Sequence, residues 1–176
     1  MPNDAHPANE RVRAYAAQRG VTIEITAFDE STHTAQEAAD AIGVALGQIV
    51  KSLVFMAPVD PAIDDGEMEP VMALVRGTDR VDISKLAVVS GRPRLRRASA
   101  KEAKHATGYS IGGVPPFAHD RTTLVVMDPA LDGYEEVWAA AGTPTTVFPI
   151  APATLALLSD ALVLPCAEDV PVEVRP

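Results

Sequence analysis

Apolar and polar residues follow two distinct periods along this chain. Residues 21–25 alternate between apolar and polar side chains, which predicts a half-buried strand. Residues 49–56 and 71–75 are almost wholly apolar and indicate strands that are buried on both faces. The acidic segment 60–69 between them contains a glycine and is bracketed by prolines, so the two strands are predicted to form a hairpin with a long tip.

Further elements are marked by their end signals. Thr34 with Glu37 and Ser99 with Glu102 have the spacing of helix capping boxes, and Asn9 and Asp82 are suited to begin helices. The predicted helices span residues 9–19, 34–43, 82–89, 100–106 and 152–159. The other predicted strands span residues 94–98, 124–127, 136–140, 145–150 and 162–164.

The order of these elements predicts one domain of mixed α/β (α+β) class. Strands and helices do not alternate strictly, which argues against a doubly wound parallel sheet and favours a mixed, partly curled sheet with short helices around it. A length of 176 residues fits a single domain. We predict a flexible tail over residues 1–8, the folded domain over 9–166 and a second tail over 167–176.

Charge is unevenly distributed. The chain carries a net charge of −9, yet residues 76–105 hold nine Lys and Arg against three Asp and Glu, which gives +6 there and −15 elsewhere. This basic segment is either a solvated surface with scattered ion pairs or a face that attracts a polyanion. A single cysteine, no long apolar run and no secretory signal indicate a cytoplasmic protein without a membrane span.

Lys51 stands inside a predicted buried strand. Its face includes Leu53 and Phe55, and an ammonium group pointing into an apolar interior is costly unless it is paired or lies at a cavity. The strand therefore either opens onto a pocket or places Lys51 beside an acid. A lysine that reaches solvent from the start of the strand is the remaining alternative.

Gly112 and Gly113 form the second candidate site. Adjacent glycines leave backbone amides unshielded, and such amides can hold an anion or a carbonyl oxygen that gains charge. A plain tight turn is the alternative. The four histidines have no recognised ligand spacing, so no metal site is expected, and Trp138 and Cys166 are interpreted as core residues.

Five segments together resemble the YbaK/EbsC family, the free-standing relatives of the editing domain inserted in bacterial prolyl-tRNA synthetases. They are TAQEAA at 34–39, IVKSLV at 49–54, RVDISKL at 80–86, TGYSIGGVPP at 107–116 and VWAAAGTP at 137–144. The resemblance implies a single domain with a partly barrel-like central sheet. It also implies hydrolysis of the ester of mischarged aminoacyl-tRNA, with neither a metal nor an organic cofactor.

The resemblance assigns roles to residues of this chain. It places Lys51, Gly112 and Gly113 in the catalytic site. It implies substrate-binding positions at Ser52, Phe28, His33, Ile111, Val114, Pro115, Pro116, Gly142 and Thr143. The candidates for contact with the tRNA backbone are Arg76, Arg80, Arg94, Arg96 and Arg97. The implied partners are a mischarged aminoacyl-tRNA and prolyl-tRNA synthetase, with no role for DNA or a membrane.

Two positions depart from the family pattern. Many members have a glycine where this chain has Ala118, and some cysteine-specific members have an aspartate near residues 146–148, where this chain has no acid.

The alternative functions are a non-catalytic module that binds tRNA or a synthetase, and a hydrolase of small esters. Alanine, serine, threonine, cysteine and 2-aminobutyrate all remain possible substrates, because one methyl group discriminates by only about 1–3 kcal/mol.

Overall fold

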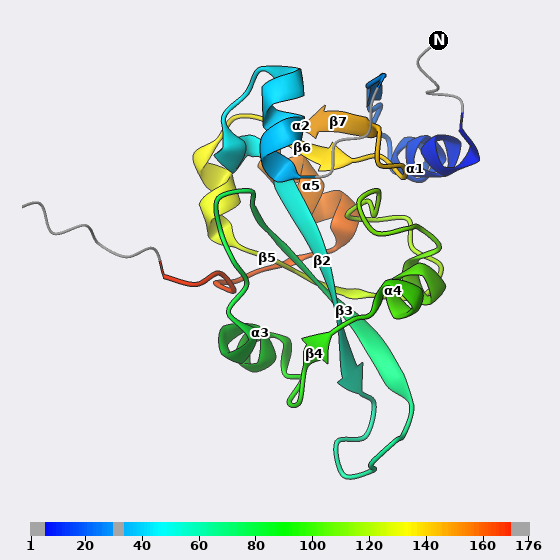
Figure 1. Cartoon of the computed structure of the whole chain (residues 1–176), viewed down its shortest axis with the longest axis vertical. Coiled ribbons are helices and arrows are strands. Elements are labelled where there is room, and N and C mark those ends of the chain that lie inside the picture. Colours follow the sequence, from blue (N-terminus) through cyan, green and yellow to red (C-terminus); the bar gives the residue numbers. More distant parts are fainter. Residues whose placement is uncertain (1–5, 30–33, 170–176) are drawn as a thin grey trace, which may run out of the picture.

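Two β-sheets meet at the start of one long strand (Figure 1). The structure is a computed structural model, and it describes residues 6–29 and 34–169. The larger sheet has the strand order β4-β2-β3-β5-β8 and mixes antiparallel with parallel pairs. Its strands are β2 (Val50–Pro58), β3 (Met68–Arg76), β4 (Arg96–Arg97), β5 (Leu124–Met127) and β8 (Leu162–Val163).

The hairpin of β2 and β3 is the longest feature of the fold, and its tip extends beyond the rest of the molecule (Figure 1). Lys51 pairs with Val75 and Phe55 with Val71, so the predicted hairpin is confirmed. Val54 belongs to one apolar cluster and Phe55 to another, on opposite faces of the sheet. Because both faces are covered, the sequence of these strands is continuously apolar rather than alternating.

The smaller sheet has the order β1-β7-β6. Its strands are β1 (Thr26–Ala27), β6 (Val137–Ala140) and β7 (Thr146–Ile150). An isolated bridge between Ile49 and Trp138 joins it to the start of β2, but over the described residues the two sheets do not close into a barrel. The strand predicted over residues 21–25 was wrong. Of the pairings that the structure describes in this segment, only that of Thr26–Ala27 is present, although Ile23 is buried as its alternation requires.

Five α-helices surround the sheets in the described part of the chain. Thr34, Asp82 and Ser99 cap α2, α3 and α4 as predicted, each accepting a hydrogen bond from the backbone N–H three residues later. The helices are α1 (Pro7–Gln18), α2 (Ala35–Ile42), α3 (Ile83–Ser90), α4 (Ala100–Thr107) and α5 (Pro152–Ser159).

Both predicted tails include residues that belong to the folded domain. Helix α1 starts at Pro7 and is capped by His6, whereas Asn9 is fully buried inside the helix. The Asn9 amide donates hydrogen bonds of 2.8 Å to the Ala141 carbonyl and 2.8 Å to a threonine hydroxyl of β7. At the other end, Ala167 is buried and bridges Val81, so packing continues past residue 166.

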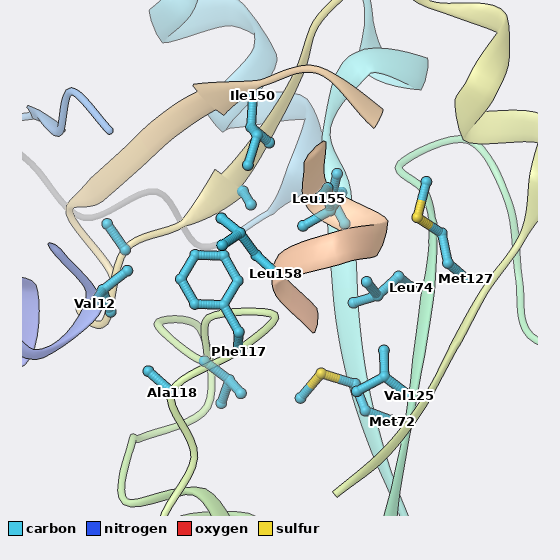
Figure 2. Close-up of a cluster of buried hydrophobic side chains, with 14 of the residues drawn as sticks. Val12, Met72, Leu74, Phe117, Ala118, Val125, Met127, Ile150, Leu155 and Leu158 are labelled. Atoms are coloured by element: carbon cyan, nitrogen blue, oxygen red, sulfur yellow. The ribbon is translucent and has the colours of Figure 1, made fainter. Parts of the chain in front are cut away.

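The loop that follows α4 enters the main core. Figure 2 shows Phe117 and Ala118 among Val12 of α1 and Leu155 and Leu158 of α5. Ala118 has φ = 67°, and its carbonyl accepts a 3.0 Å hydrogen bond from the Tyr109 hydroxyl. The loop therefore adopts a left-handed backbone at this position even though the residue is alanine. Core packing and the tyrosine hold it there.

We expect Ala118→Gly to be nearly neutral for the free energy of unfolding. Relief of the left-handed backbone, about 1–2 kcal/mol, offsets the lost methyl burial of about 0.8 kcal/mol and the greater entropy of glycine, about 0.5–1 kcal/mol. In β6, Ala139 is equally buried and is not among the residues with positive φ, so Ala139→Gly lacks this relief and costs about 1–2 kcal/mol. Urea unfolding of both variants tests this. Equal destabilisation would contradict it.

Candidate active site

A cavity of about 260 Å³ lies beside the first half of β2, where the larger sheet meets the smaller one. Its walls come from α2, the first half of β2, the 111–114 loop, and strands β6 and β7. The side chains that line it are mostly small or apolar, and Lys51, Ser52 and Arg97 are its polar members on the β2–β4 side. These elements are distant in sequence and meet only in the folded chain.

The cavity forms because, in the described part of the chain, no strand pairs with part of one edge of β2. Strand β4 pairs only with Phe55 and Met56, and the Ala98 N–H donates to the Val54 carbonyl at 3.0 Å. Residues alternate in the direction of their backbone groups along an antiparallel strand, so the N–H and C=O of Ser52 point toward this same edge. The Ser52 hydroxyl is buried and has no hydrogen-bond partner among the described residues.

Lys51 lies at the cavity and also contacts an aspartate. Its ammonium donates a hydrogen bond to the backbone carbonyl of Asp79, just beyond the end of β3. Burial lowers the pKa of Lys51, the charge of Asp79 opposes this effect, and the nearby Arg80 and Arg97 reinforce it. Of the sequence alternatives, the strand opens onto a pocket. The hydrogen-bond partner of the ammonium is the backbone carbonyl of Asp79, whereas the Asp79 carboxylate is paired with Arg76.

The two glycines of the loop have different environments. Gly112 lines the cavity with φ = 95°, a backbone conformation that side chains disfavour. Gly113 does not line it: its N–H already donates to the Ser110 carbonyl at 3.0 Å, and a Cβ there would lie 2.6 Å from the backbone of Thr143. Gly113 therefore permits close packing of two loops, while Gly112 is the glycine that faces the cavity.

Pro115, Pro116 and His119, which follow the glycines, support this loop on the side away from the cavity. Pro115 and Pro116 are buried and do not line the cavity. The His119 Nε2–H donates to the Pro115 carbonyl at 2.7 Å, and burial lowers the pKa of His119. We interpret these residues as supports for the loop rather than as contacts for a ligand.

The other predicted substrate-binding positions divide between the cavity and its surroundings. Ser52, Ile111 and Val114 line the cavity. Gly142 and Thr143 line a second cavity of about 560 Å³ on the far side of Pro144. Phe28 lines neither of these two cavities and donates its N–H to the Thr145 carbonyl, while His33 lies outside the described residues.

The predicted basic face is largely neutralised by ion pairs. Arg76 pairs with Asp79, Arg94 with Asp64, and Arg96 with Glu102. Within the described ranges no carboxylate lies at ion-pair distance from Arg80 or Arg97. Arg97 also lines the cavity, with its guanidinium carbon 5.6 Å from the centroid of the Phe55 ring, so it is the arginine best placed to meet a ligand.

Several cavity residues were not predicted. Trp138 is only partly buried and forms a wall, and its indole N–H is buried without a partner among the described residues. Thr34, Ala35 and Ala38 contribute from α2. The sequence signal that could have identified Trp138 as a cavity residue was a large aromatic side chain next to a run of alanines. The bridge between Trp138 and Ile49, which places it at the cavity, depends on long-range pairing.

Other chemistry has little support in the described part of the chain. No three His, Cys, Asp or Glu side chains there gather into a group that could hold a metal ion. Cys166 is fully buried, and this burial raises the pKa of its thiol to about 12, which disfavours the thiolate. No described helix is long and apolar enough to cross a membrane.

The fold and the cavity define a mixed α/β protein with a small ligand site at an open strand edge. A family model described as an aminoacyl-tRNA editing domain matches residues 29–158, and the chain therefore belongs to this family. The uncharacterized protein YwhH of Bacillus subtilis (strain 168) is 31% identical over 149 residues, which are 84% of this chain and 88% of YwhH.

Two further relatives carry functional descriptions. The multifunctional Ser/Thr-tRNA deacylase ProXp-y of Escherichia coli (strain K12) is 28% identical over 135 residues, 76% of this chain and 77% of that protein. A crystal structure of a proposed trans-editing enzyme for prolyl tRNA synthetase superposes with a TM-score of 0.81 at 39% identity. The match covers 93% of this chain and 98% of the other. The resemblance inferred from the sequence is confirmed.

We expect Gly113→Ala to destabilise the protein, because its Cβ would meet the Thr143 backbone, which cannot rotate away. Overpacking of this kind costs about 1–3 kcal/mol, a fall of several degrees in Tm for a chain of this size. Gly133→Ala is the matched control, since a Cβ there meets nothing within 4 Å. Thermal unfolding of both variants measures the difference, and an unchanged Tm for Gly113→Ala would refute the close-packing role.

Proposed function

We propose that this protein hydrolyses the ester bond of mischarged aminoacyl-tRNA, acting as a separate chain in the cytoplasm. The observation that carries the proposal is the convergence of Lys51, Arg97 and Gly112 on one small cavity at an open strand edge. The relatives support it, because one is described as a tRNA deacylase and another as a proposed trans-editing enzyme. The link to prolyl-tRNA synthetase is part of this proposal.

The chemistry requires no protein nucleophile, because an aminoacyl ester is already activated. In our proposal the aminoacyl group enters the cavity and the N–H of Gly112 donates to the carbonyl oxygen as it gains charge. One such donor contributes about 3–4 kcal/mol in other enzymes. A vicinal ribose hydroxyl of the tRNA helps to activate the attacking water. Because the N–H of Gly113 is already used, a single amide of this pair serves the ester.

The cations hold the end of the tRNA. Lys51 contributes a point charge to the terminal phosphate, and Arg97 lies beside it at the cavity. Arg80 extends the positive field on the same side. Arg76, Arg94 and Arg96 no longer belong to the proposed tRNA contacts, because each is already paired with a carboxylate.

The cavity favours a small amino acid, since about 260 Å³ must hold the side chain and part of the ester. Its walls also contain two polar groups without partners among the described residues, the hydroxyl of Ser52 and the indole N–H of Trp138. Unpaired buried polar groups are costly, and a substrate hydroxyl could satisfy either one after a small local adjustment. We therefore rank serine and threonine above alanine as the amino acid removed.

A deacylation panel tests this function. Catalytic amounts of protein are added to tRNA for proline, alanine and threonine charged with Ala, Ser, Thr, Cys or 2-aminobutyrate. We expect multiple turnovers on one seryl or threonyl ester. For Lys51→Ala we expect kcat/KM to fall about 10–100-fold, the loss of one charge-assisted contact. Lys101→Ala, on the exposed surface of α4, is the control. No turnover with any ester would favour a non-catalytic tRNA- or synthetase-binding module.

A second test concerns the tRNA contact. Arg97→Gln should weaken binding of uncharged tRNA and reduce the slope of log K against log salt by about 0.7–1, the value for one phosphate contact. Arg94→Gln should leave the slope unchanged, because Arg94 donates to the Pro61 carbonyl and Asp64 at the hairpin tip. Equal effects of the two substitutions would contradict a local contact at Arg97.

A further inference from the structure

Asp79 is a buried acidic residue in direct contact with the candidate catalytic lysine. Its side chain is only 3% exposed, and its carboxylate accepts hydrogen bonds of 2.7 Å from Nε and 3.0 Å from a terminal nitrogen of Arg76. The Thr78 hydroxyl donates to the same carboxylate at 3.2 Å. Through its backbone, Asp79 also accepts the hydrogen bond of the Lys51 ammonium.

The turn that carries Asp79 is fixed to β2. The Gly77 N–H donates to the Ile49 carbonyl at 2.7 Å, and the Asp79 N–H donates to the Arg76 carbonyl at 2.9 Å. A Cβ on Gly77 would lie 2.5 Å from the Leu46 carbonyl oxygen, so this approach depends on glycine. The position of the Asp79 carbonyl relative to Lys51 is therefore set by the backbone and not by a mobile side chain.

The charges around Lys51 are otherwise unfavourable to an ammonium group. Arg80 follows Asp79 directly, Arg97 approaches from β4, and Arg76 stands at the end of β3 next to Val75, the cross-strand partner of Lys51. Among the described residues that influence the Lys51 charge, Asp79 is the single acid. Burial lowers the pKa of Lys51 and Asp79 acts against this, so its carboxylate is the countercharge of the cluster.

We propose that Asp79 is a positioning residue for Lys51: its carbonyl fixes the ammonium at the cavity, and its carboxylate keeps that ammonium charged beside Arg80 and Arg97. The inference rests on the proposed function for its consequence, since a charged Lys51 is what holds a phosphate group. The coupling between the two residues is a property of the free protein and can be measured without tRNA.

The direct test is a titration of Lys51. Reductive methylation with ¹³C-formaldehyde labels each of the four lysines, and the Lys51 resonance is the one missing from Lys51→Ala. We expect Asp79→Asn to lower the midpoint of the Lys51 titration by about one pH unit or more, because an opposite charge is removed while the arginines remain. Arg80→Gln should raise it, and we expect this variant to fold because the Arg80 side chain is exposed. The signal of the exposed Lys101 should not move.

An unchanged Lys51 midpoint in a folded Asp79→Asn protein overturns the inference. If that variant unfolds, the double variant Asp79→Asn/Arg76→Gln removes the ion pair as a unit, and Arg76→Gln alone is its reference. The Lys51 midpoint of the double variant should lie below that of Arg76→Gln, and equal midpoints overturn the inference equally. A merely structural role would lower Tm without a selective change at Lys51.

Activity gives the second readout. In Asp79→Asn, kcat/KM for the best ester should fall more at pH 8.5 than at pH 6.5 relative to the wild type, because Lys51 loses its proton at a lower pH in this variant. A parallel fall at both pH values contradicts the charge role. If the wild type hydrolyses no ester, the proposed function fails, whereas the titration still decides whether Asp79 controls the charge of Lys51.

Discussion

The pairing of β2 with β3 is the constraint on which the rest of the structure depends. Nine residues of each strand are in register, and both faces of the pair are covered by apolar clusters. The other edge of β2 is paired only in part among the described residues, through the bridge at Ile49 and the two-residue strand β4. The gap between these partners borders Ser52 and Lys51. The candidate site exists because, among the described residues, β2 has a full partner on one edge and only partial partners on the other.

Around that gap, glycines allow backbone segments to pack closely against one another. Gly77 lets the turn with Asp79 approach Leu46, and Gly113 lets the loop lie against Thr143. The same loop continues into the core through Phe117, where Ala118 retains a left-handed backbone because the surrounding contacts outweigh its cost. A short segment thus connects cavity and core. Substitutions on either side can alter both stability and site geometry.

The sequence alone was sufficient to predict local features such as helix caps, but it was insufficient to predict which distant segments pair with one another. Helix caps such as Thr34 and Ser99 are decided within a few residues and were predicted correctly. The alternation of residues 21–25 correctly indicated the burial of Ile23, but it could not show that no strand among the described residues pairs with this segment. Likewise, nothing local indicated that Arg96 would be paired with Glu102 while Arg97 stays available, because that difference arises from which side of β4 each faces.

Asn9 links the first helix to the end of β6 and the start of β7. Its buried amide donates to the Ala141 carbonyl and to the Thr146 hydroxyl, 132 and 137 residues later. During synthesis, the first helix leaves the ribosome long before these partners exist. Its anchoring, and with it the segment against which the glycine loop packs, must wait until most of the chain has emerged. A nascent chain would therefore carry no completed site, and the site would be completed only late in translation.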